Sequence, residues 1–144
     1  MKVNKKIGKG TALVWLFLAI SCFSLLAENG RADAVIFSTY SPGGVSNGGM
    51  EPVFTTSQNQ MITMIRTYHW NNGNGASPGS IGIAGYGSWP ATGEPEGSVP
   101  NAYWVAYPNI QLPPGTYRIT DSDASTWSQN SGTGGVGFAW VFAS

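Results

Sequence analysis

Residues 135–142 read GVGFAWVF, and this stretch decides the fold class because large and small side chains alternate along it. An alternation with a period of two is typical of a β-strand, whose successive side chains point to opposite faces of a sheet. The larger side chains share one face: Val136, Phe138, Trp140 and Phe142. We expect this face to pack in a hydrophobic core, with the glycine and alanine positions facing outward.

Six further runs rich in β-branched and aromatic residues lie between clusters of turn-forming residues. They are residues 35–40, 52–56, 61–70, 80–85, 102–107 and 115–121. Because no segment after residue 34 shows a sustained helical period, we predict an all-β domain. About seven short strands predict a single β-sandwich with a jelly-roll or immunoglobulin-like topology.

The run at residues 80–85 repeats the alternation, with Ile81 and Ile83 opposite Gly82 and Ala84. If this strand and the one at 135–142 share a sheet, the outer face of that sheet is flat and nearly bare. A bare face of this kind accepts a loop of the same chain, a second protomer or a planar ligand.

The first 34 residues differ in kind from the rest. Residues 1–10 contain four lysines, residues 11–27 form an apolar run without charge, and a short polar stretch ends in Ala32-Asp33-Ala34. This order is typical of a secretory signal peptide, which predicts cleavage after Ala34 and a secreted, periplasmic or cell-surface domain over residues 35–144. Two alternatives stay open: an uncleaved membrane anchor, and lipid attachment at Cys22.

Residues 35–144 contain no lysine and no cysteine. Their seven charges give a net charge of −3, from Arg66, Arg118, Glu51, Glu94, Glu96, Asp121 and Asp123. This balance argues against nucleic acid as a partner, because nucleic-acid binding needs a basic patch. Without cysteine the domain has no disulfide, and once the signal is removed nothing predicts stable insertion into a membrane.

Arg66 falls in an apolar row of the 61–70 strand, where an unpaired cation is costly to bury. We therefore predict a structural ion pair between Arg66 and Asp121, with Asp123 as the other candidate partner.

No catalytic machinery is recognisable, and we predict that the protein is not an enzyme. His69 is the only histidine in the chain. A catalytic triad or a histidine-based metal site needs companions that this sequence does not offer. Glu94 and Glu96 lie two residues apart in a loop rich in glycine and proline, which is typical of solvated carboxylates rather than of a glycosidase pair.

The segment Asp121-Ser122-Asp123-Ala124-Ser125 begins like a calcium-binding loop. The glycine and glutamate that an EF-hand needs further along are absent, so only a looser calcium site through Asp121, Asp123 and Asn130 stays open. The alternative is a turn in which aspartate and serine side chains bond nearby backbone amides. We predict no other cofactor.

Aromatic residues are the strongest functional signal. Fifteen of the eighteen in the chain lie after residue 34, and several fall at loops beside Asn, Ser and Gly. Tryptophan and tyrosine faces flanked by hydroxyls and amides suit sugar rings. The candidate ligand-binding residues are Trp70, Tyr86, Trp89, Trp127 and Asn130. The alternative is that these rings close the ends of the sandwich.

Several segments of the sequence together resemble a module found in bacterial secreted and surface proteins without an assigned activity. They are TYHWN at residues 67–71, LPPGTYRITDSDASTWSQN at 112–130 and GFAWV at 137–141. The resemblance covers residues 61–142 and implies a compact extracytoplasmic β-module, with no catalytic residue to carry over.

We therefore expect a secreted, non-catalytic binding module, with an extracellular polysaccharide or cell-surface glycan as ligand. The second hypothesis is a structural surface or matrix subunit that self-associates through a sheet face or an edge strand.

Overall fold

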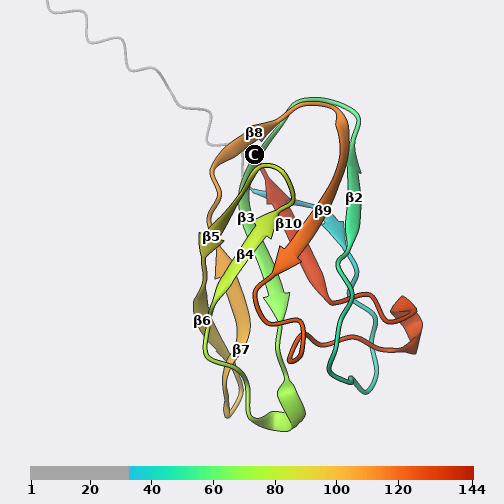
Figure 1. Ribbon diagram of the computed structural model, residues 1–144, viewed down its shortest axis with the longest axis vertical. Helices are drawn as coiled ribbons and strands as arrows, with labels where there is room; N and C mark the ends of the chain where they lie inside the picture. Colours follow the sequence, from blue (N-terminus) through green and yellow to red (C-terminus); the bar gives the residue numbers. More distant parts are fainter. Residues whose placement is uncertain (1–32) are drawn as a thin grey trace, which may run out of the picture.

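Two antiparallel sheets pack face to face in the computed structural model, which describes residues 33–144 (Figure 1). The six-stranded sheet has the order β1-β10-β3-β7-β6, and β8 also pairs with β3. Its strands are β1 (Ala34–Ser38), β3 (Gln60–Tyr68), β6 (Thr92–Glu96), β7 (Val99–Ala106), β8 (Ile110–Leu112) and β10 (Ala139–Ala143). The four-stranded sheet has the order β2-β9-β4-β5. Its strands are β2 (Val53–Thr56), β4 (Ser80–Ile83), β5 (Gly87–Pro90) and β9 (Gly115–Asp121). Two single turns of 3₁₀-helix, η1 (Asn71–Gly73) and η2 (Ser131–Thr133), lie in loops.

The strand pairs are nested along the chain. β1 pairs with β10, β2 with β9, β3 with β7 and β8, and β4 with β5, all antiparallel. A ribbon of nested pairs rolled into two sheets is a jelly roll. The predicted all-β sandwich is therefore confirmed, and the topology is the first of the two that the sequence predicted.

The described residues form ten strands rather than seven. β5 and β6 lie between the predicted runs 80–85 and 102–107, and β8 lies between the predicted runs 102–107 and 115–121. Pro90 and Pro95 obscure the first two, because proline weakens a strand pattern. Both strands are at sheet edges, where a proline that cannot donate to a ladder is tolerated.

The faces of the last strand are the reverse of the predicted ones. Ala139, Val141 and Ala143 point into the sandwich and are buried in its core, whereas Trp140 lies on the outer face of the six-stranded sheet. The strand begins at Ala139 rather than at residue 135, and the period of two holds from there on, but the choice of face was based on side-chain size. That choice was wrong because the large rings on the outer face bury one another.

The second alternating run also lies elsewhere than expected. β4 belongs to the four-stranded sheet and β10 to the six-stranded sheet, so the two strands do not build one bare face. Ile81 and Ile83 are buried in the core, as their alternation predicted. Opposite them, Gly82 leaves room for the side chain of Thr120 and the backbone of β5.

The core between the sheets combines aliphatic residues from both with four aromatic residues, Phe54, Trp104, Tyr117 and Trp127. Strand β3 contributes both Ile62 and Ile65, three positions apart, because a shift in its register against β10 turns the strand between them. The bulge places Ile62 and Ile65 on the same inner face, whereas strict alternation would put them on opposite faces.

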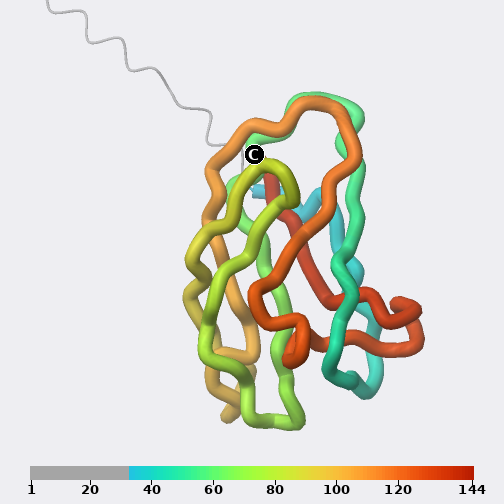
Figure 2. Tube along the Cα trace, in the orientation of Figure 1, coloured from blue at the N-terminus to red at the C-terminus, as the bar shows by residue number. Residues whose placement is uncertain are grey.

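The loop between β9 and β10 runs alongside the segment that follows β1 (Figure 2). Bridges join Ser46 to Gln129 and Met50 to Val136. Near the other end of the sandwich, β1 is paired with β10 from Ala34, opposite Ala143, to Ser38, opposite Trp140.

The predicted signal segment, including Cys22, lies outside the described residues except for its last two positions. The cleavage site after Ala34 therefore stays a prediction. In residues 33–144 there is no helix with the length and apolar character needed to cross a membrane.

Candidate functional site

A continuous group of aromatic rings covers part of the outer face of the six-stranded sheet, and we call it the aromatic face. It consists of Tyr40, Tyr68, Trp70, Tyr103, Phe138 and Trp140. The pairing of three strands brings these rings together. Tyr68 of β3 lies opposite Tyr103 of β7, and Trp140 of β10 lies opposite Arg66, two positions before Tyr68.

The rings contact one another in sequence across the sheet. The centroids of Tyr68 and Tyr103 are 5.0 Å apart, and those of Tyr103 and Trp140 are 6.1 Å apart in an edge-to-face arrangement. Tyr40 stacks on Trp140 at 5.8 Å, and Phe138 lies beneath, 5.7 Å from Tyr40 and 6.3 Å from Tyr68. Offset and edge-to-face contacts at these distances stabilise aromatic pairs. The rings therefore support each other on a face that the second sheet does not cover.

A groove of about 890 Å³ opens over the aromatic face. All six rings line it, together with Gly43, Gly44 and Val45 after β1 and residues 96–99 around the turn between β6 and β7. We call this cavity the aromatic groove. Glu96 is the one charged side chain among the residues that line it.

The Glu96 carboxylate accepts hydrogen bonds from two phenols of the groove. The hydroxyl of Tyr68 donates to Oε2, and the hydroxyl of Tyr103 donates to Oε1 over 3.3 Å. Burial raises the pKa of the Tyr68 hydroxyl well above its usual range, and the bond to Glu96 raises it further. The pKa of Tyr103 is raised by burial first and then by the charge of Glu96. Both phenols therefore stay protonated and keep donating to the carboxylate.

The predicted ion pair between Arg66 and Asp121 does not form. Arg66 points to the outer face and pairs with Glu94, with 3.2 Å between Nη2 and Oε2. Its guanidinium carbon also lies 5.1 Å from the centre of the Tyr103 ring. Asp121 is on the opposite side of β3, facing Thr67, because adjacent residues of a strand point to opposite faces.

His69 is the centre of a buried network of polar side chains inside the sandwich. Its Nε2 lies 3.1 Å from both Asp121 Oδ2 and Thr67 Oγ1, and its Nδ1 lies 2.8 Å from Thr126 Oγ1. The Thr67 hydroxyl donates to Asp121 Oδ2 over 2.9 Å, and Trp104 stacks on the imidazole at 3.8 Å. The side chains of His69 and Asp121 are both fully buried, so a substrate has no access to them. The network joins β3 to β9 across the core.

The two aspartates after β9 form a turn. Asp121 Oδ1 accepts the backbone N–H of Asp123 over 2.9 Å, and the Asp123 carboxylate accepts the hydroxyls of Ser125 and Thr126. These bonds, the one from Ser125 foremost, lower the pKa of Asp123. The alternative to calcium, a turn stabilised by its own side chains, is the one found.

The looser calcium site is not assembled. Asp121 is engaged by His69 and Thr67, and the amide of Asn130 caps η2 and donates to the Ser41 carbonyl over 3.0 Å. In the part of the chain that the structure describes, no group of three or more histidine, cysteine, aspartate or glutamate side chains is placed to hold a metal ion.

Of the predicted ligand-binding residues, Trp70 alone lies in the aromatic groove. Trp127 is fully buried in the core, and its indole N–H donates to the Phe138 carbonyl over 2.9 Å. Asn130 is buried and serves as the helix cap. Neither side chain lines the groove, because their loop folds back over the core instead of facing solvent.

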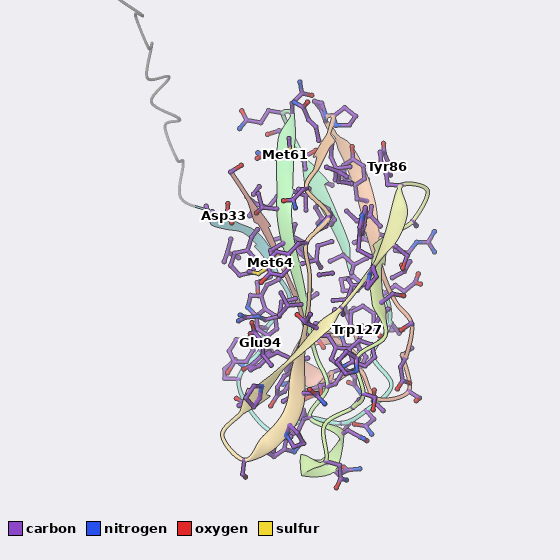
Figure 3. All side chains as sticks on the ribbon, turned by 90° about the vertical axis from the view of Figure 1, so that its left-hand side faces the viewer. Asp33, Met61, Met64, Tyr86, Glu94 and Trp127 are labelled. Carbon is purple, nitrogen blue, oxygen red and sulfur yellow. The ribbon has the colours of Figure 1, made fainter. Side chains whose placement is uncertain are left out.

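Trp89 and Tyr86 belong to the other side of the molecule. Trp89 is half-buried against the core from β5, and Tyr86 is exposed and packs edge-on against Tyr117 of β9. Figure 3 shows Tyr86 on one side of the sandwich and Glu94, next to the aromatic face, on the other. These residues therefore do not form a common site with Trp70.

Sequence reasoning missed five of the six groove rings and Glu96. The signal was present, because Tyr68 and Trp70 share one phase of their strand pattern and Phe138 and Trp140 share one phase of theirs. Of these four, Trp70 alone was named as a candidate, and the other three were assigned to the core, which removed them from the search for a site.

No family model, curated protein or solved structure matches this chain. The fold and the groove therefore define the class on their own: a small jelly-roll module with an aromatic groove on the outer face of its larger sheet.

Proposed function

We propose that this protein is a secreted, non-catalytic module that binds an extracellular polysaccharide or cell-surface glycan in the aromatic groove. The observation that carries the proposal is the set of six adjoining rings that line one open cavity. Sugar rings have apolar C–H faces that stack on aromatic rings, and hydroxyl rims that need hydrogen-bond partners. Secretion rests on the signal sequence of residues 1–34.

The dimensions and chemistry of the groove support a glycan. A cavity of about 890 Å³ is within the range of small-molecule sites. The rings provide stacking surfaces, and the Glu96 carboxylate and the phenol oxygens accept hydrogen bonds from sugar hydroxyls. The lack of lysine after residue 34 and the net charge of −3 there disfavour polyanions such as nucleic acid.

Substitution of Tyr40 by alanine tests the groove directly. Tyr40 is 58% exposed and lies against Trp140, so its removal exposes little core but deletes one stacking surface. After a glycan screen has found a binding oligosaccharide, we expect Tyr40→Ala to weaken its binding about tenfold, equivalent to about 1.4 kcal/mol. Isothermal titration calorimetry measures this change.

Tyr107 offers a matched control for that experiment. It is 56% exposed and does not line the groove, so Tyr107→Ala should bind the oligosaccharide like the unmodified protein. Equal affinity of the Tyr40→Ala variant and the unmodified protein, or an equal loss in both variants, would remove the groove from consideration.

Self-association through an edge strand is the second candidate function. β1 is at the edge of the six-stranded sheet, and its Val35 and Ile36 are 52% and 36% exposed. An edge strand with exposed apolar residues is a template for pairing with another chain. On this candidate the sedimentation coefficient rises with protein concentration, and Val35→Lys abolishes the rise, because lysine on an edge strand opposes pairing. A constant monomeric value across the concentration series would exclude it.

A further inference from the structure

The aromatic groove has a single charged side chain, the carboxylate of Glu96. The hydroxyls of Tyr68 and Tyr103 both donate to Glu96, so toward a ligand each phenol oxygen can act only as an acceptor. The carboxylate of Glu96 is itself acceptor-only when ionised. The faces of the surrounding rings carry negative partial charge. Glu96 is thus the one charged side chain of the lining, and the other polar groups there, the hydroxyls of Tyr40 and Ser98 and the indole N–H groups of Trp70 and Trp140, are neutral. The groove therefore has no cationic side chain to match an acidic ligand.

The positive charge nearest to the groove is already neutralised. Arg66 lies over Tyr103, but Glu94 holds its guanidinium at 3.2 Å, and Arg66 is not among the residues that line the cavity. The other arginine after residue 34, Arg118, pairs with Glu51 at 3.4 Å on strands of the four-stranded sheet and its flank. The uncompensated charge in the groove is the negative charge of Glu96.

We propose that the aromatic groove selects a glycan with free, protonated amino groups, that is, a polysaccharide of de-N-acetylated amino sugars. An ammonium group is donor-only, so it complements the Glu96 carboxylate and the two phenol oxygens. It also interacts favourably with aromatic faces within about 6 Å. The sugar ring that carries the ammonium group stacks on the neighbouring aromatic rings. This amino-sugar assignment rests on the glycan-binding function proposed above.

The decisive experiment compares ligands that differ in charge. Titration calorimetry at about pH 6, where sugar amines are mostly protonated, would use glucosamine oligomers, their N-acetylated counterparts, neutral cello-oligosaccharides and oligogalacturonate. We expect the glucosamine oligomer to bind at least tenfold more tightly than the N-acetylated and neutral oligomers, and oligogalacturonate to bind most weakly. Choline, a quaternary ammonium without a sugar ring, should bind at least tenfold more weakly than the glucosamine oligomer.

Two substitutions distinguish the effect of the Glu96 charge in the groove from the effect of the net charge of the protein. Glu96→Gln should lower the affinity for the glucosamine oligomer about tenfold and leave the affinity for neutral oligomers within about twofold. Glu51→Gln removes the same charge from an exposed position outside the groove and should change neither affinity. If Glu96→Gln does not fold, the salt dependence of the unmodified protein serves instead: raising NaCl from about 20 to 500 mM should reduce the preference for the amino sugar.

The outcomes are distinct for the two proposals. If no oligosaccharide binds, or if binding does not depend on Tyr40, the glycan-binding function itself is overturned. If neutral oligomers bind in a Tyr40-dependent way and as tightly as glucosamine oligomers, the amino-sugar assignment alone fails. An equal effect of Glu51→Gln and Glu96→Gln, a preference that salt does not reduce, or choline binding as tight as that of the glucosamine oligomer would also overturn the assignment.

Discussion

Replacement of Trp127 by alanine is expected to lower the free energy of unfolding by about 3–5 kcal/mol. The indole is fully buried, and its N–H donates to the Phe138 carbonyl over 2.9 Å. It lies against two glycines, and a Cβ added at Gly137 would come within 2.5 Å of the ring, so the fit is close on that side. Alanine would leave a large cavity and remove one of the two hydrogen bonds that the Phe138 carbonyl accepts, the other coming from the backbone N–H of Tyr68. Urea unfolding followed by circular dichroism measures the loss.

Trp89 is the matched control for Trp127, because it is a tryptophan that is only half-buried. Trp89→Ala should cost clearly less stability, because less apolar surface returns to water. A Trp127→Ala variant with an unchanged urea midpoint would contradict the core position of this ring. If that variant also lost glycan binding, Trp127 would be a ligand contact, as the sequence first indicated.

Replacement of Asp121 by alanine is expected to lower the free energy of unfolding by about 3 kcal/mol, the upper end of the usual cost of leaving buried hydrogen-bonding groups without their partner. Its carboxylate accepts from the Thr67 hydroxyl and from the backbone N–H of Asp123, and it lies 3.1 Å from His69 Nε2. Alanine would leave these groups buried without their shared partner. Thermal and urea unfolding measure the change.

Asp123 provides the comparison for Asp121. Its carboxylate bonds to Ser125 and Thr126 within the same turn and lies nearer to solvent, so Asp123→Ala should cost about 1 kcal/mol, the value typical of a local hydrogen bond. Equal losses for the two variants would mean that the network around His69 adds no stability beyond the turn itself.

The fold class was predictable because it depends on local features. Strict alternation in residues 135–142, glycine and proline between short β-branched runs, and the absence of a helical period each indicate strands without knowledge of long-range contacts. The turn after Asp121 was predictable for the same reason, since its hydrogen bonds are local. Asp121 Oδ1 accepts from the backbone of Asp123, and the Asp123 carboxylate accepts from Thr126.

The missed strands show the limit of local patterns. β8 has three residues and exists because Ile110 and Leu112 pair with Ile62 and Gln60 of β3, about fifty positions earlier. β6 contains glycine and proline and pairs with β7 through its backbone. Backbone hydrogen bonds to a partner strand require no particular side chains, so these segments have no strong sequence pattern.

The site was less predictable than the fold because it depends on which face of each strand meets the second sheet. Period-two patterns divide side chains into two sets, but they do not say which set points inward. Arg66 was assigned to the core with its neighbours Tyr68 and Trp70, and its pairing with Glu94 on the outer face shows that this part of the row was reversed.

Composition and local periodicity thus specified an all-β sandwich, its turns and a surface poor in charge, because these properties arise within a few residues of chain. The position of the aromatic groove, the burial of Trp127 and the partners of Arg66 and Asp121 arose only when strands far apart in the chain became neighbours. Cross-strand register and the side covered by the second sheet bring Tyr40, Tyr68, Tyr103 and Trp140 together, and these are properties of the packed structure.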